Sequence, residues 1–190
     1  MAKTIVKAFS VFTGYLWYLS LYCIIFPFLV LFLGTKMDIF VFGLFFKTDP
    51  FPPLLLLPTI AGIALFMFGI IVAIASVYYL HKKARFFPLD ALNMKEFLPQ
   101  ALVKEGVYGY VRHPMLLGYF FMMIGLAFTL SSPMSVIWTI PLFFWAAYEY
   151  EVLIEERRLL SWFGEEYITY KNTVPFMFPF LKKNAFFKKK

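Results

Sequence analysis

The stretch Gly106–Gly118, GVYGYVRHPMLLG, joins a polar segment to a long uncharged one. Residues 115–148 follow without one Asp, Glu, Lys or Arg, and Ser131-Ser132-Pro133 near the middle predicts a tight turn between two helices. Carboxylates then return as a cluster: Glu149, Glu151, Glu155 and Glu156. Polar groups at the two ends of one hairpin lie close in space. We therefore expect the Arg-His-Pro step and the glutamates, about 40 residues apart in sequence, to form one site.

The composition predicts an all-α integral membrane protein. The chain is 62% hydrophobic and only 15% charged, whereas a soluble domain is about 25% charged. Its uncharged runs exceed the roughly 20 residues that span a bilayer. Its 190 residues suit a single membrane domain, 1–190. The first apolar run is too long for the core of a signal peptide, and no small-residue cleavage site closes it.

Two further apolar runs precede the hairpin. Ala8–Thr35 is predicted as the first membrane helix, with a kink at Pro27, and Lys36–Pro53 as a loop. Pro50–Leu80 is the second uncharged run. With the hairpin, about four transmembrane helices result. They divide into an N-terminal two-helix part, 1–80, and a part 81–190 that holds the loop, the hairpin and the tail.

Glycines in the second and third helices predict that each packs closely against a neighbouring helix. Gly62 and Gly69 lie on the second apolar run and would let a neighbouring helix approach closely. Gly118 and Gly125 lie seven apart, so both face one side of the third helix and can pack against a neighbour.

Basic residues set the expected orientation. They gather at the N-terminus, in the His81–Arg112 loop and in a basic, aromatic tail, Tyr167–Lys190, which follows a helix capped by Gly164. With four spans, all of these segments fall on the cytoplasmic side. The net charge of +7 suits anionic lipid head groups. Because no basic, aromatic-interleaved soluble module is present, we expect no nucleic-acid partner.

Cysteine and histidine usage argues against a metal centre. Cys23 is the only cysteine, which excludes an internal disulfide and a Cys-only metal site. The two histidines, His81 and His113, are far apart in sequence, and we expect no metal.

The polar ends of the hairpin carry the candidate chemistry, since ionisable groups beside hydrocarbon are costly. Pro114 suits the first turn of a helix, so His113 stands at a helix N-terminus whose free N–H groups can hold a ligand carboxylate. Arg112 could equally extend to the membrane interface. Glu151 and Glu155 are four apart and repel each other on one helix face. A cationic ligand would relieve this repulsion, as Arg158 could in part.

These motifs resemble one known family. They comprise Leu102–Tyr108, Arg112-His113-Pro114 with Gly118, Glu155-Glu156, Phe163–Tyr167, Tyr170 and Val174-Pro175. Together they look like the isoprenylcysteine carboxyl methyltransferase family, whose broader group includes phospholipid N-methyltransferase-like membrane enzymes. The resemblance covers roughly residues 100–179.

The resemblance implies an integral membrane methyltransferase that uses S-adenosylmethionine and acts on a lipidic or small hydrophobic acceptor, such as a membrane lipid or a lipidated substrate. It implies a cytosolic cofactor pocket closed by the loop and the C-terminal segments. Glu155 would bind the amino group of the cofactor. The family's other cofactor contacts map onto Leu102, Val103, Tyr108, His113 and Pro114.

Two departures from the family pattern leave the acceptor open. Leu116 stands where an aromatic residue is usual, and Glu151 stands where prenylcysteine enzymes place an arginine that grips the substrate carboxylate. Glu151 and Arg112 are therefore the substrate-side candidates, with Arg112 as a replacement for the missing arginine. In the alternative, phospholipid N-methyltransferase-like amine methylation, Glu151 would assist removal of a proton.

Two other classes compete. A sterol-type membrane reductase shares a similar Arg-His motif and uses NADPH, but that motif usually continues with Asn where Met115 stands. A non-catalytic scaffold or small transporter explains the helices but not the ordered polar motifs.

Overall fold

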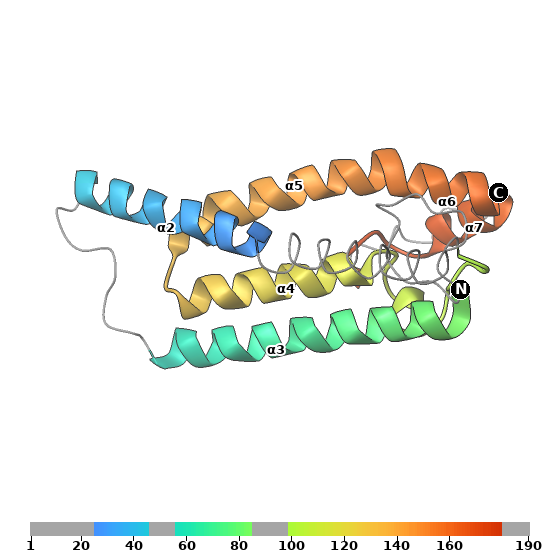
Figure 1. Cartoon of the computed structure of the whole chain (residues 1–190), viewed down its shortest axis with the longest axis horizontal. Helices are drawn as coiled ribbons and strands as arrows, with labels where there is room; N and C mark the ends of the chain where they lie inside the picture. Colours follow the sequence, from blue (N-terminus) through green and yellow to red (C-terminus); the bar gives the residue numbers. More distant parts are fainter. Residues whose placement is uncertain (1–24, 46–55, 85–98, 180–190) are drawn as a thin grey trace, which may run out of the picture.

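The computed structural model describes residues 25–45, 56–84 and 99–179, and all regular structure in these ranges is helical. The helices are α2 (Phe26–Phe45), α3 (Leu56–Tyr79), α4 (Pro114–Thr129), α5 (Ile140–Tyr150), α6 (Glu156–Phe163) and α7 (Glu165–Thr173). Helices α3, α4 and α5 run side by side, with α6 and α7 at one end and α2 beside the other (Figure 1). The all-α prediction is confirmed for the described residues.

Helix α2 and the segment Leu57–Ala84 are long and apolar enough to cross a membrane. Only 22% and 17% of their apolar windows are buried, so their hydrophobic side chains face outward, as lipid-facing helices require. Helix α4 is apolar but has only 16 residues. The count of four spans, the orientation and the division at residue 80 stay predictions.

The predicted loop Lys36–Pro53 is wrong over its first part, because α2 continues to Phe45. The two charges that suggested a loop have partners. Asp38 is fully buried and accepts hydrogen bonds from the Ser132 hydroxyl and, at 2.9 Å, from the Met134 amide. Lys36 lies over the Phe32 ring at 5.3 Å. The rest of that loop and the first predicted helix before residue 25 lie outside the described ranges. Pro27 is buried at the start of α2, and the kink predicted there stays a prediction, because it depends on the residues before it.

Helices α3 and α4 approach each other at the predicted glycines. A Cβ on Gly69 would lie 2.5 Å from the carbonyl oxygen of Gly118, and one on Gly125 would lie 2.6 Å from that of Gly62. Backbone therefore packs directly on backbone, which aligns the α4 N-terminus with the end of α3. This prediction is confirmed.

We expect Gly69→Ala to destabilise the chain by about 1–3 kcal/mol, because the new methyl group must push the two helices apart. The thermal unfolding midpoint in detergent measures the effect. Gly43→Ala is the matched control, since a Cβ there meets nothing within 4 Å and alanine favours a helix by roughly 0.5–1 kcal/mol over glycine. Equal midpoints for the two variants would contradict the close contact.

The predicted hairpin is present. The chain turns at Ser131, whose φ is 51°, and the Ser132 amide donates to the Ala127 carbonyl at 2.9 Å. A π turn, Ser135–Thr139, precedes α5, and a second, Glu151–Glu155, joins α5 to α6. Helix α6 ends at Phe163, and Gly164 follows as the predicted cap, with a positive φ of 51° that favours glycine.

The predicted tail, Tyr167–Lys190, is helical through Thr173 in α7. The chain then folds back onto the start of α4. The amides of Arg112 and His113 donate to the carbonyls of Pro175 and Phe176 at 2.9 and 3.0 Å. The C-terminal region therefore belongs to the folded body at the polar end of the hairpin.

Candidate active site

His113 stands at the N-terminus of α4 and is buried. Its amide is held by the Phe176 carbonyl, and its ring packs on the Phe176 ring with centroids 4.4 Å apart. Pro114 follows as the first helical residue, which ends any helix before it and fixes the direction in which α4 leaves. The contacts with Phe176 and the start of α4 at Pro114 therefore fix the position of the imidazole.

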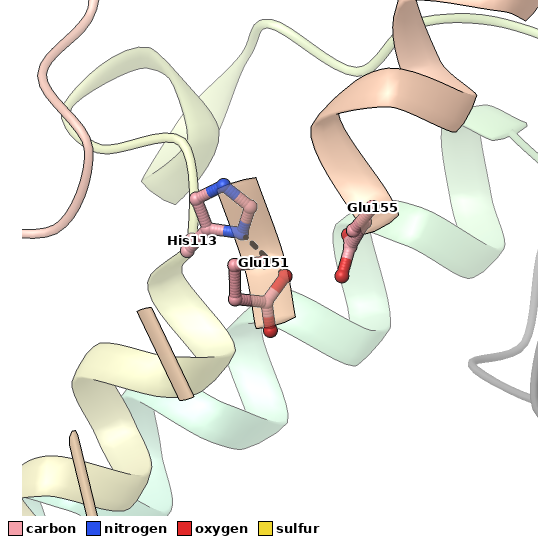
Figure 2. A group of neighbouring side chains, drawn as sticks. All are labelled: His113, Glu151 and Glu155. Carbon is pink, nitrogen blue, oxygen red and sulfur yellow. Dashed lines mark ion pairs between the residues drawn. The ribbon is translucent and has the colours of Figure 1, made fainter. Parts of the chain in front are cut away.

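Glu151 and Glu155 reach this imidazole from the other end of the hairpin. His113 Nδ1 lies 3.2 Å from Glu151 Oε2, and one polar atom from each of His113, Glu151 and Glu155 lies within 4.8 Å of the others. Figure 2 shows the imidazole paired with Glu151 and the Glu155 carboxylate beside them. We call these three residues the His–Glu cluster. The hairpin thus brings its two polar ends together.

Glu156 is the residue that sequence reasoning did not select as a site residue. Its side chain is only 3% exposed, and its Oε1 lies 2.8 Å from an Arg112 Nη and 3.5 Å from His113 Nε2. Its Oε2 lies 2.6 Å from Lys171 Nζ. The adjacent Glu155-Glu156 pair was visible in the sequence, but nothing there indicated that both carboxylates turn inward.

The π turn Glu151–Glu155 explains why Glu151 and Glu156 both face the hairpin. Residues five apart, such as Glu151 and Glu156, lie about 140° apart around a regular α-helix with 3.6 residues per turn. Here the Glu156 amide donates to the Glu151 carbonyl, and this wider turn brings the two side chains toward one face. Such single π turns occur frequently at functional sites.

Arg112 is engaged with protein groups. Besides Glu156, its guanidinium donates to the carbonyls of Lys171 and Val174 at 2.8 and 2.9 Å, and it lies over the Phe176 ring at 5.8 Å. It therefore ties the C-terminal segment to the start of α4. Its substrate-side role stays a prediction.

The other predicted cofactor residues lie on the segment before α4. Tyr108 is buried, its carbonyl accepts from the Tyr170 hydroxyl at 2.7 Å, and burial together with the Glu155 charge raises the pKa of its own hydroxyl. Val103 packs with Tyr108 and Ala84, and Leu102 is half-buried beside it. Tyr108 thus connects this segment with the His–Glu cluster.

A groove of about 340 Å³ lies next to this site on the surface of α7. Its lining includes Lys104, Glu166, Thr169 and Tyr170 but not the His–Glu cluster. It adjoins the site through Tyr170, whose hydroxyl holds the Tyr108 carbonyl. The predicted cytosolic cofactor pocket therefore stays a prediction.

The charges in the site support one another. Burial lowers the pKa of His113, but Glu151 and Glu156 raise it more, to about 9. Burial raises the pKa of Glu156, but His113, Lys171 and Arg112 lower it to about 2. Against burial, hydrogen bonding with Glu155 and with His113 lowers the pKa of Glu151 overall. At neutral pH the centre is a His113 imidazolium beside the carboxylates of Glu151 and Glu156.

Stability should consequently depend on pH in a defined window. The His113 contribution is complete below its usual pKa of 6.5 and is lost as pH rises to about 9. The Glu156 contribution is complete above 4.5 and is lost as pH falls to about 2. One pKa unit corresponds to about 1.4 kcal/mol, so the thermal midpoint should fall clearly between pH 6.5 and 9. His113→Ala should remove this alkaline decline, and an unchanged decline would contradict the assignment.

The arrangement suits a ligand that carries both charges. Two neighbouring carboxyl groups, Glu151 and Glu155, are disfavoured from being ionised at the same time, and an ammonium or sulfonium beside them would relieve this. The cationic His113 and the N–H groups that open α4 favour an anionic group. The cluster is also close enough to surround a metal ion. That none binds stays a prediction.

A family model described as phospholipid methyltransferase matches residues 57–166, more than half of the chain. The chain belongs to the phospholipid methyltransferase family. The match includes α3, α4 and α5, the Arg-His-Pro step and the His–Glu cluster, so the helices that build the site are those of this family.

Curated relatives of this phospholipid methyltransferase family member include proteins named Protein-S-isoprenylcysteine O-methyltransferase. The Saccharomyces cerevisiae protein is 37% identical over 90 residues, covering 47% of this chain and 37% of its own length. The Homo sapiens protein is 38% identical over 81 residues, covering 43% of this chain and 28% of its own. The chain therefore spans well under half the length of either. No solved structure matches the chain.

Proposed function

We propose that the chain is an integral membrane methyltransferase that uses S-adenosylmethionine and acts on a lipidic or small hydrophobic acceptor. The observation that carries the proposal is the His–Glu cluster, formed from both ends of the hairpin in a member of the phospholipid methyltransferase family. A carboxylate pair beside an imidazolium matches a ligand that has an amine, a sulfonium and a carboxylate. A chain with membrane-capable helices suits an acceptor that arrives through the lipid.

Each site residue has a proposed role toward the cofactor. Glu155 binds the amino group, while His113 and the α4 N-terminus bind the carboxylate. The remaining contacts come from Leu102, Val103, Tyr108 and Pro114. When bound, S-adenosylmethionine supplies an electrophilic methyl group. The protein mainly has to position the acceptor and exclude water, and the folded-back C-terminal segment beside His113 suits both tasks.

The acceptor proposed first is the carboxylate of an isoprenylated cysteine, as the names of the relatives suggest. The second candidate is a lipid amine. Glu151 favours it, because this carboxylate pairs with His113 inside the site, would repel an anionic acceptor and can take a proton from an ammonium. Arg112 would favour the first candidate if it turned toward an acceptor carboxylate.

Transfer of a radiolabelled methyl group tests the proposal. Purified chain in lipid vesicles would receive labelled S-adenosylmethionine with either an S-isoprenylated cysteine or phosphatidylethanolamine. Label in one acceptor identifies the reaction, and Glu155→Gln should abolish it. No transfer to either acceptor, by a chain that binds neither S-adenosylmethionine nor its demethylated product, would refute the proposal.

The proposed orientation places this site and both termini on the cytoplasmic side, where the soluble cofactor is available. Labelling of single cysteines placed at Lys83 and at Lys190, in a Cys23→Ser background, tests it. Both positions should react from the same side of sealed vesicles, and reaction from opposite sides would contradict it.

A further inference from the structure

Glu156 lies where three parts of the chain meet. It is the first residue of α6, and its partners are Arg112 and His113 at the start of α4 and Lys171 near the end of α7. No other carboxylate in the described residues is so deeply buried next to the His–Glu cluster. Its burial is tolerable because cationic groups surround it.

Both oxygens of Glu156 face protein cations. Oε1 lies 3.1 Å from Arg112 Nε and 2.8 Å from an Arg112 Nη, and Oε2 lies 2.6 Å from Lys171 Nζ. Glu151 pairs with His113, and with Glu155 these residues form the group that lies close enough together to surround a cation. Glu156 is therefore placed to hold protein groups and not a ligand.

Arg112 links Glu156 to residues 171–176, here called the C-terminal strap. Its guanidinium, fixed by Glu156, donates to the carbonyls of Lys171 and Val174. The backbone amides of Arg112 and His113 donate to Pro175 and Phe176. The strap in turn places the Phe176 ring against the imidazole of His113. One carboxylate thus orients the strap and, through it, the ring.

We propose that Glu156 is a positioning residue, which fixes the C-terminal strap over the site and orients the His113 imidazole without itself touching cofactor or acceptor. The effect on catalysis rests on the proposed function, whereas the effects on the strap and on His113 do not. The charge of Glu156 also supports the raised pKa of His113, to which Glu151 and Glu155 contribute as well.

Glu156→Gln keeps the shape and removes the charge. Glu166→Gln is the matched control, because Glu166 also pairs with a lysine, Lys104 at 2.8 Å, but is half exposed. Three measurements would be made on each full-length variant: binding of S-adenosylhomocysteine by calorimetry, the pKa of His113 by NMR of nitrogen-15-labelled histidine, and hydrogen exchange of the Arg112 and His113 amides. His81→Ala assigns the two histidine signals.

For Glu156→Gln we expect the pKa of His113 to fall by about one unit, faster exchange of both amides, and weaker cofactor binding that recovers partly below the new pKa. Glu166→Gln should change none of these. If Glu156→Gln left the pKa of His113 and the exchange of both amides unchanged, the proposal would be overturned. If cofactor binding were lost in that case, Glu156 would be a ligand contact. A wild-type chain that fails to bind refutes the proposed function, while pKa and exchange still decide the role of Glu156.

Lys171→Met provides a second variant if Glu156→Gln does not fold. Lys171 is about half exposed, so its loss should be tolerated. With one cation fewer on Glu156, the pKa of His113 should rise, opposite to the effect of Glu156→Gln, and the Arg112 and His113 amides should exchange faster. No change in either quantity would overturn the proposal. The titration involves every charged or titratable neighbour of the imidazole: Arg112, Glu151, Glu155, Glu156, Lys171, Tyr108 and Tyr167.

Discussion

Replacing His113 with alanine should weaken the binding of S-adenosylhomocysteine by about 10- to 100-fold, since a hydrogen bond to a charged group contributes about 1.5–3 kcal/mol. The imidazolium is the cationic side chain of the His–Glu cluster and stands at the N-terminus of α4. Glu155→Gln should cause a loss of similar size, because the amide replaces the carboxylate that would face the ligand's amino group. Calorimetric titration of the detergent-purified chain measures both.

Matched controls separate these effects from general damage. His81→Ala removes the only other histidine, which is exposed at the end of α3, and Glu166→Gln removes an exposed carboxylate. Both controls should bind as the wild type does. If His113→Ala and Glu155→Gln both fold and both bind normally, the cofactor does not lie in the His–Glu cluster.

Arg112→Ala should destabilise the chain by roughly 3–5 kcal/mol, the cost typical of removing one partner from a buried ion pair. The substitution leaves Glu156 buried, with the partly exposed Lys171 and the His113 imidazole as its cationic neighbours. It also frees the carbonyls of Lys171 and Val174. The thermal unfolding midpoint and the pH dependence of stability should both change.

Two further variants are compared with Arg112→Ala in the stability measurement. Arg157→Ala removes a neighbouring arginine that is exposed, and it should leave the midpoint nearly unchanged. Arg112→Lys keeps the charge but loses the planar fork that binds one carboxylate and two carbonyls, so an intermediate loss is expected. Arg112→Ala with wild-type stability would show that the buried pair does not hold the C-terminal strap.

The features that follow from local sequence rules were predictable. The length of the uncharged run predicted the hairpin. Ser131-Ser132-Pro133 predicted its turn, and Pro114 predicted the start of α4. The glycines indicated where helices pack closely, and the structure shows that α3 and α4 are the two helices concerned. The same rules placed His113 and Glu151 at neighbouring ends of one hairpin, where the structure has them 3.2 Å apart.

The features that were missed depend on contacts distant in sequence. The end of α2 was misplaced because Asp38 is buried by partners in the hairpin turn, Ser132 and Met134, more than 90 residues later. Glu156 was missed because spacing arguments assume a regular α-helix, and the π turn changes which side chains share a face. The strap is held by hydrogen bonds to its backbone carbonyls. Because every residue has such a carbonyl, no residue pattern predicts this contact.

We propose that the two polar ends of one membrane hairpin jointly bind a sulfonium nucleoside. Titration of the wild-type chain with S-adenosylhomocysteine and, separately, with NADPH decides this. We expect saturable binding of S-adenosylhomocysteine at one site per chain and no binding of NADPH. Saturable NADPH binding, with none of S-adenosylhomocysteine, would contradict it and favour a reductase.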